Sequence, residues 1–376
     1  MTTLDATDLR ALSADAGWRR EIEEAVHAGG RLSREQGEAL YATDDLAWLG
    51  GLARAAQRSV SGDQVLFNVN RHLNLTNVCA ASCAYCTFER KPGQSDAYTM
   101  RITEAVAKAK EMEGEGLTEL HVVNGLHPLL PYEYYPNSIR KLKDALPGVA
   151  IKAFTATEID WFCGLTDKDA GWVLDDLIAA GLESLTGGGA EIFDEEVRAK
   201  IVDHATHWER WSEIHALAHS KGLKTPATML YGHIEGPRHR VDHVLRLRGL
   251  QDQTGGFVTF IPLRFHPEGS RLGHIPIATG AEAMKTFAVS RLLLDNFKHL
   301  KCFWVMHGLT LAQLLLEFGV DDLDGSVVEY KITHDPTGAT PSTMHREDLL
   351  RLIREAGRIP VERNTRYEVV RTYDAA

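Results

Sequence analysis

The stretch Val65-Leu-Phe-Asn-Val-Asn-Arg-His-Leu-Asn-Leu-Thr-Asn-Val-Cys-Ala-Ala-Ser-Cys-Ala-Tyr-Cys86 joins an apolar segment to a cluster of three cysteines. Residues 65–74 predict a β-strand, and Cys79, Cys83 and Cys86 follow it with the spacing C-x3-C-x2-C. Thiolates are soft ligands that select iron–sulfur clusters, zinc or copper(I) over hard cations. A [4Fe–4S] cluster normally takes one thiolate on each of its four irons, so three cysteines leave one iron without a protein ligand.

This spacing resembles the cysteine motif of the radical SAM superfamily, and Tyr85, directly before the last cysteine, strengthens the resemblance. The resemblance implies that Cys79, Cys83 and Cys86 hold a [4Fe–4S] cluster whose open iron binds S-adenosylmethionine (SAM). One electron from the reduced cluster would then cleave SAM to methionine and a 5′-deoxyadenosyl radical. Tyr85 would lie against the adenine of SAM.

Other uses of three clustered cysteines fit the sequence less well. A structural zinc site takes four ligands, and the two remaining cysteines, Cys163 and Cys302, are isolated. A disulfide needs an oxidising compartment, whereas the first residues carry no apolar secretory segment. We therefore expect a cytoplasmic protein. A non-catalytic electron-transfer protein stays open as an alternative, although a shell of four thiolates is typical of that class.

Composition narrows the possible partners. The chain has 376 residues, of which 44% are hydrophobic, and its formal net charge is −11. An acidic balance argues against binding to nucleic acid, and no apolar run reaches the ~20 residues that span a bilayer. We therefore expect an enzyme that acts on a small molecule, with no nucleic-acid or membrane partner. The oligomeric state does not follow from the sequence.

Apolar strand patterns alternate with helical patterns from about residue 65, which predicts a parallel sheet. The predicted strands are 65–74, 120–124, 150–156, 184–186, 225–231, 258–262, 301–306 and 320–323. The predicted helices between and after them are 103–115, 135–145, 166–180, 207–221, 237–254, 281–297, 309–318 and 345–356. Eight strands favour a (β/α)8 TIM-type barrel over an open barrel of six.

The predicted organisation has three parts. Residues 1–60 form a helical N-terminal lead-in, in which Ser33 and Gln36 predict a capping box. Residues 61–345 form the barrel core, and residues 346–376 form a C-terminal helix and short extension that pack on the barrel. In barrels of this kind the functional residues lie at the C-terminal ends of the strands, which is where the cysteines fall.

Further candidate residues follow the other predicted strands. Asn124 and Gly125 suit contact with the amino acid part of SAM, because glycine lets backbone approach a ligand closely. An ordinary Asn-Gly turn is the alternative. Glu191 can accept hydrogen bonds from an ammonium or ribose hydroxyl, or it serves only as an acidic residue at a helix N-terminus.

An anionic substrate would suit a second group of candidates. Arg264, His266 and Arg271 follow a predicted strand, and Arg71 and His72 precede the cysteine loop on the first strand. Arginine binds carboxylates through two parallel hydrogen bonds, so we predict that these five residues bind substrate. A structural ion pair is the alternative for the arginines.

The resemblance extends along nearly the whole chain. Similar segments are Asn70–Cys79, Asn124–Pro128, Gly189–Phe193, Gly319–Gly325 and Gly357–Arg363. Together they resemble the aminodeoxyfutalosine synthases, a family of the futalosine route to menaquinone. The segments from Gly319 to Arg363 point to this branch, whereas the cysteine motif indicates the superfamily only.

Membership would imply a defined reaction. The adenosyl radical would add to 3-[(1-carboxyvinyl)oxy]benzoate, and rearrangement with loss of bicarbonate would give 6-amino-6-deoxyfutalosine. SAM is then consumed, which makes the enzyme a transferase. An electron donor such as flavodoxin or ferredoxin would reduce the cluster. Cyclic dehypoxanthine futalosine synthase and a deazaflavin-type synthase subunit, which abstract hydrogen instead, are the nearest alternatives.

Overall fold

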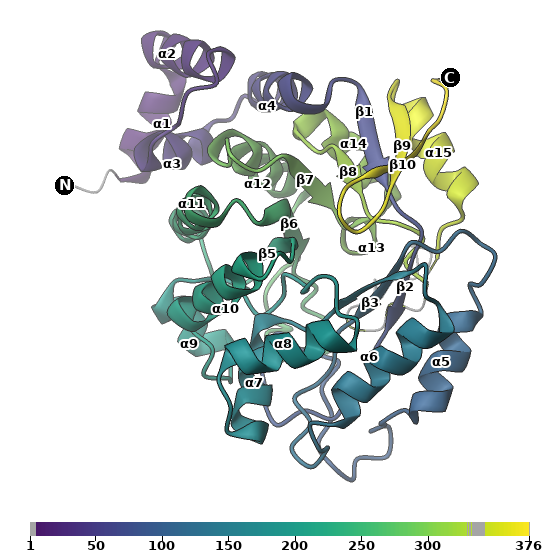
Figure 1. Ribbon diagram of the computed structural model, residues 1–376. Helices are drawn as coiled ribbons and strands as arrows, with labels where there is room; N and C mark the ends of the chain where they lie inside the picture. The colour runs from purple at the N-terminus through teal and green to yellow at the C-terminus, as the bar shows by residue number, and fades with distance from the viewer. Residues whose placement is uncertain (1–4, 329, 331, 333–342, 376) are drawn as a thin grey trace.

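The computed structural model describes residues 5–328, 330, 332 and 343–375, and its centre is a ring of parallel strands with helices outside it (Figure 1). The strands are β1 Gln64–Phe67, β2 Asn70–Leu73, β3 Glu119–Val122, β4 Ala150–Ala153, β5 Thr225–Tyr231, β6 Phe257–Arg264, β7 His299–Cys302, β8 Asp322–Leu323, β9 Ile359–Arg363 and β10 Val369–Thr372.

Two short links close these strands into a barrel. Strands β2, β3 and β4 form one sheet, and β5 to β8 run side by side in a second. Ser184 forms a parallel bridge with Lys152 on β4, and its hydroxyl donates to the carbonyl of Lys224, just before β5, at 2.6 Å. Arg71 on β2 forms a parallel bridge with Val328, which follows β8. Within the described residues, the segment at Ser184 and seven strands complete the predicted (β/α)8 TIM-type barrel.

The first barrel strand is broken, which the sequence did not predict. Residues 65–74 were expected to form one strand, but β1 pairs with β8 and β9, whereas β2 pairs with β3. Gly325 lies against the break, and a Cβ on it would meet the carbonyl oxygen of Asn68 at 1.9 Å. A glycine is therefore required where these two backbones approach each other.

Helices cover the outside of the barrel (Figure 1). They are α5 Ile102–Lys110, α6 Tyr134–Ala145, α7 Ala156–Thr166, α8 Ala170–Ala180, α9 Glu195–Ile201, α10 Trp208–Ser220, α11 Pro237–Thr254, α12 Gly280–Leu293, α13 Trp304–His307, α14 Leu309–Leu315, the 3-10 turn η1 Leu316–Phe318 and α15 Arg346–Glu355. Pro237 begins α11, where its fixed φ and missing N–H cost nothing.

Several element boundaries differ from the predictions, and two of these differences follow from features of the sequence. The helix expected over 166–180 is two helices, because Asp167 adopts a left-handed conformation at the end of α7 and the Asp169 carboxylate caps α8. The strand expected over 301–306 ends at Cys302, and Trp304 begins α13. Apolar residues run through both halves of that stretch, so the hydrophobic pattern does not separate a buried strand from a buried helix.

Four helices precede the barrel, namely α1 Ala6–Ala14, α2 Ala16–His27, α3 Arg34–Ala42 and α4 Leu46–Ser61. The predicted capping box at α3 is confirmed, because the Ser33 hydroxyl accepts from the Gln36 backbone and the Gln36 side chain accepts from the Ser33 backbone. α4 packs on α12, and α3 packs on α11 and α12. This helical segment therefore lies against one side of the barrel (Figure 1).

The last residues close the N-terminal end of the barrel. β9 pairs in parallel with β1, and β10 folds back antiparallel on β9, although the sequence predicted only an extension. The Arg363 guanidinium contacts the Asp322 carboxylate at 2.8 Å, and the Thr365 hydroxyl donates to Glu119 at 2.9 Å. The division at residues 60 and 345 stays a prediction.

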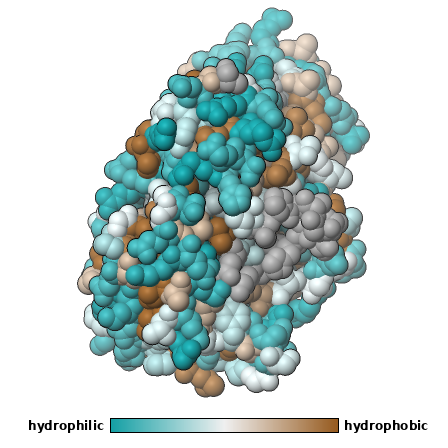
Figure 2. Space-filling view, turned by 90° about the vertical axis from the view of Figure 1, so that its right-hand side faces the viewer, coloured by the Kyte–Doolittle hydropathy of each residue, from teal (hydrophilic) through white to brown (hydrophobic). Residues whose placement is uncertain are grey.

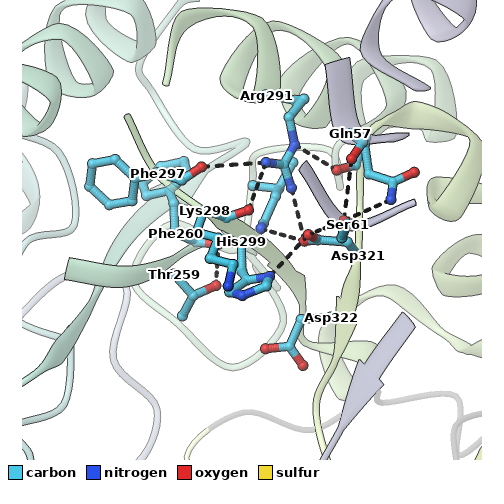
Figure 3. A network of polar contacts seen from close by, with 12 residues as sticks. Gln57, Ser61, Thr259, Phe260, Arg291, Phe297, Lys298, His299, Asp321 and Asp322 are labelled. Carbon is cyan, nitrogen blue, oxygen red and sulfur yellow. Dashed lines mark hydrogen bonds and ion pairs between the residues drawn. The ribbon is translucent and has the colours of Figure 1, made fainter. Parts of the chain in front are cut away.

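A buried carboxylate ties the N-terminal helices to the barrel (Figure 3). Asp321, just before β8, accepts from Ser61 on α4 and from Arg291 on α12, both at 2.8 Å. It also contacts the ring of His299 on β7 at 3.0 Å. Burial alone would raise the pKa of Asp321, but the charge of Arg291 and the hydrogen bond with His299 outweigh it and hold that pKa below its usual value.

The molecular surface is predominantly polar on the face shown in Figure 2, with apolar residues in small separate groups. Exposed large apolar side chains of the described residues include Leu129 and Trp172, and scattered apolar residues are normal on a protein surface. None of the described helices is both long enough and apolar enough to cross a membrane.

Candidate active site

A cavity of about 280 Å³ opens within the barrel, and the cysteine loop forms part of its wall. Cys79, Cys83 and Cys86 line it together with residues that follow β3, β4 and the segment at Ser184. The residues predicted for SAM, namely Tyr85, Asn124, Gly125 and Glu191, all lie in the same wall. This end of a parallel barrel is where catalytic groups collect.

Backbone amides donate to sulfurs of the cysteine loop. The amide of Leu126 donates to Cys79 Sγ at 3.3 Å, and the amide of Asp203 donates to Cys83 Sγ at 3.4 Å. Hydrogen bonds of this kind stabilise the negative charge of ligating thiolates. Lys91 donates to the carbonyls of residues 79, 80 and 81 at 2.7–3.1 Å, so the start of the loop is held in one conformation.

Asn124 and Gly125 connect the end of β3 to the cysteine loop. Asn124 accepts from the Leu75 backbone at 2.6 Å and donates to Glu158 at 3.1 Å. A Cβ on Gly125 would meet the carbonyl oxygen of Val78 at 2.4 Å. Gly125 is therefore also required for packing against the cysteine loop, a reason that the sequence did not reveal.

Glu158 is a carboxylate of the cavity wall that was not among the predicted site residues. It caps α7 through Thr155 and receives the amide of Asn124 at 3.1 Å. Burial raises the pKa of Glu158 to about 7. The sequence could have identified Glu158 as a site residue, because it lies directly after a predicted strand, where polar residues face the cavity.

Glu191 and Tyr85 both line the cavity and form a hydrogen bond with each other. The Tyr85 hydroxyl donates to Glu191 Oε1 at 2.7 Å, whereas Glu191 Oε2 is buried and has no hydrogen-bond partner among the described residues. Burial raises the pKa of Glu191, and Arg198 at 3.8 Å opposes that shift. A buried carboxylate oxygen that accepts no hydrogen bond is costly even beside a cation, so Oε2 suits a ligand that donates a hydrogen bond.

Deeper in the barrel lies a polar layer, here called the lumen floor and defined as His72, His121, Lys152, Lys301 and Asp324, all of which line the cavity. His72, His121 and Lys152 face one another in strand register. The rings of His72 and His121 stack at 4.5 Å. Of these residues the sequence predicted only His72. The other floor residues could have been predicted from charged side chains at alternate positions inside otherwise apolar strands.

The remaining predicted substrate residues do not line the cavity. Arg71 is buried with its guanidinium 2.8 Å from Glu111, directly after α5, because neighbouring residues on a strand point to opposite faces. Arg264 donates to the carbonyl of Ala278, and His266 lies 2.8 Å from the carbonyl of Met306. Arg271 donates to the carbonyl of Ser82 on the cysteine loop. None of these four side chains lines the cavity, and each contacts another protein group instead.

Known proteins match both halves of this chain. Residues 73–247 match the radical SAM superfamily, and residues 254–375 match the CofH/MqnC C-terminal region. An aminodeoxyfutalosine synthase of Streptomyces coelicolor is 66% identical over 96% of each chain. The chain belongs to the radical SAM family of aminodeoxyfutalosine synthases. Another aminodeoxyfutalosine synthase, from Thermus thermophilus, is 44% identical over 94% of this chain and 96% of its own.

Solved structures support the fold of this radical SAM family member. HydG, a maturase of the [FeFe]-hydrogenase, superposes with a TM-score of 0.74 over 94% of this chain and 78% of its own, at 16% identity. The predicted family and barrel are thus confirmed. Members of the superfamily use a [4Fe–4S] cluster and SAM, and so does this enzyme.

The residues present fit these two cofactors. Among the described residues, no three His, Cys, Asp or Glu side chains converge on one metal ion. A cubane needs no such convergence, because each thiolate binds a different iron. Three cysteine sulfurs around one cavity, two of them receiving backbone amides, are the donor set for a cluster with one open iron. The free oxygen of Glu191 offers an acceptor to SAM.

Proposed function

We propose that this enzyme joins the 5′-deoxyadenosyl group of SAM to 3-[(1-carboxyvinyl)oxy]benzoate and, with loss of bicarbonate, forms 6-amino-6-deoxyfutalosine. The observation that carries the proposal is the 66% identity to the Streptomyces coelicolor aminodeoxyfutalosine synthase, which extends over 96% of both chains. The cysteine loop, the cavity wall and the lumen floor all lie within the matched length. The protein is an enzyme that acts on a small molecule and requires a reductant.

Each part of the cavity wall receives a role in this proposal. Cys79, Cys83 and Cys86 hold the cluster, which when reduced supplies the electron that releases the adenosyl radical from SAM. Glu191 accepts a hydrogen bond from SAM through its free oxygen, and Tyr85 lies against the adenine. Asn124 and Gly125 present backbone groups to the amino acid part of SAM.

The barrel also protects the reaction from water. Apolar side chains of the wall include Leu126, Leu230, Ile261, Leu263 and Phe303. These side chains form no hydrogen bonds with water. An apolar wall from which bound substrate displaces water suppresses side reactions of a reactive intermediate.

The reductant and the compartment complete the proposal. We infer that a small electron carrier such as flavodoxin or ferredoxin reduces the cluster, and that the protein works in the cytoplasm, where thiolates are kept reduced. Arg271 and Ser82 lie at the outer side of the cysteine loop, so a carrier docked there would approach the cluster closely.

The product assay tests the activity. The anaerobically reconstituted enzyme is mixed with dithionite, SAM and 3-[(1-carboxyvinyl)oxy]benzoate, and products are identified by mass spectrometry. We expect methionine together with an adduct that contains the intact adenosyl group. Accumulation of 5′-deoxyadenosine without the adduct would instead indicate a hydrogen-abstracting relative, such as cyclic dehypoxanthine futalosine synthase.

Replacing Glu191 by glutamine is expected to raise the KM for SAM by about tenfold, because a hydrogen bond to a charged group contributes about 1.5–3 kcal/mol. The Glu191→Gln variant keeps the shape of the side chain and removes its charge. Iron content should be unchanged, since Glu191 is not a cluster ligand. Glu196, which is exposed on α9, gives the matched control Glu196→Gln. An unchanged KM in Glu191→Gln would remove Glu191 from the SAM site.

A further inference from the structure

Two buried lysines on the lumen floor have donors that the protein does not fully use. Lys152 Nζ lies 2.5 Å from Glu119, and Lys301 Nζ lies 3.6 Å from Asp324. An ammonium has three N–H donors, so each ion pair fixes the position of a lysine and leaves donors for a further group. Both side chains are at least 93% buried.

A third group on the floor has an open hydrogen-bonding position. The Nε2 atom of His72 is buried and has no hydrogen-bond partner among the described residues. Burial lowers the pKa of His72 well below its usual value, so the ring is neutral and one of its nitrogens is a donor. A buried unpaired polar atom at the surface of a cavity is a position that a ligand would satisfy.

Apolar side chains form another part of the wall of the same cavity. They are Leu230 on β5, Ile261 and Leu263 on β6, and Phe303 after β7. A flat aromatic ring would pack on these side chains, while an anionic substituent on that ring would reach the lysines. The cavity therefore combines a surface for a ring with donors for a carboxylate.

We propose that Lys152, Lys301 and His72 bind the ring carboxylate of the benzoate substrate and thereby set its orientation. The inference rests on the proposed function, in which the vinyl double bond reacts with the adenosyl carbon of SAM. SAM binds beside the cysteine loop, so the double bond must face that end of the cavity. The ring carboxylate, at the other end of the substrate, then points down the barrel to the lumen floor. Arg71, Arg264 and Arg271, which lie outside the cavity, take no part in binding it.

Binding measurements without reductant test this assignment separately from turnover. The reconstituted holoenzyme with SAM is titrated calorimetrically with 3-[(1-carboxyvinyl)oxy]benzoate and with 2-phenoxyprop-2-enoate, which lacks only the ring carboxylate. We expect the wild type to bind the first compound about tenfold or more tightly, as for a charge-assisted hydrogen bond. In Lys301→Met the preference should fall to about twofold or less, because affinity for the second compound is retained.

A matched control and a second variant complete the test. Lys298→Met removes an exposed lysine three residues earlier in the chain and should keep the full preference. If Lys301→Met does not fold, the double variant Lys301→Met/Asp324→Asn removes both charges of the pair and should show the same loss. A tenfold preference that survives in the folded variant overturns the assignment and leaves the proposed function intact. If the wild type binds neither compound, both the assignment and the proposed function fail.

Discussion

Replacing Cys83 by alanine is expected to abolish iron loading and turnover. Cys79, Cys83 and Cys86 line one cavity, and a cubane that already has one open iron cannot lose a second ligand and keep its site. Cys83 is also the sulfur that receives the amide of Asp203 at 3.4 Å. The measurement is iron and sulfide content after anaerobic reconstitution, together with the charge-transfer absorption of the cluster.

Cys163 provides the control for that variant. It lies on α7, outside the cavity, where Arg210 contacts its sulfur at 3.5 Å. Cys163→Ala should bind as much iron as the wild type and turn over at a similar rate. Full turnover by Cys83→Ala, or equal loss of iron in both variants, would contradict the assignment of the cluster to the loop.

The barrel could be predicted because the period of the hydrophobic pattern changes regularly along the chain. Strands such as β5 are buried along their whole length, as expected for parallel strands covered by helices. The break between β1 and β2 could not be predicted, since the apolar pattern runs through it without interruption. It depends on Gly325, which is more than 250 residues away in the sequence and packs against Asn68.

Site residues in loops after strands were predicted more completely than those within strands, although Glu158 after β4 was missed and His72 on β2 was predicted. The cysteines, Tyr85, Asn124, Gly125 and Glu191 all stand in loops at the C-terminal ends of strands, and all line the cavity. Lys152 and Lys301 lie inside β4 and β7. Whether these two lysine side chains point into the barrel depends on strand register, because a shift of one residue turns a side chain to the other face of the sheet.

Three arginines were predicted to bind substrate, but their side chains do not line the cavity. Charge and a place near the cysteine loop favour Arg71 as a substrate ligand, but its neighbour His72 is the residue that lines the cavity. Arg264 is the last residue of β6 and Arg271 follows that strand, yet their guanidinium groups donate to backbone carbonyls. Residue type alone indicated an anion site in this protein, whereas strand geometry assigns that role to the lysines and to His72.

Replacing Asp321 by alanine is expected to lower the free energy of unfolding by about 3–5 kcal/mol, the cost of leaving a buried charge without its partner. Asp321 and its partner Arg291 are both buried, at 2.8 Å, and Ser61 and His299 would also lose an acceptor. Urea unfolding of the apoprotein under reducing conditions gives the difference. Asp144→Ala, which removes an exposed ion pair on α6, should change stability little.

The Asp321→Ala variant also tests how the free energy of unfolding depends on pH. Because the pKa of Asp321 is lower in the folded protein than in the unfolded chain, the unfolded state binds the proton more readily, and acid favours unfolding. The contribution of Asp321 is complete above the unfolded pKa of about 3.9 and is lost as the pH falls through the lower folded value. The difference in stability between wild type and Asp321→Ala should therefore be constant from pH 6 to 8, taken as roughly two units or more above that pKa, and should shrink below about pH 4. A difference that grows in acid would mean that Asp321 is protonated in the folded state, and that backbone carbonyls, those of Phe297, Lys298 and Gly319, stabilise the Arg291 guanidinium.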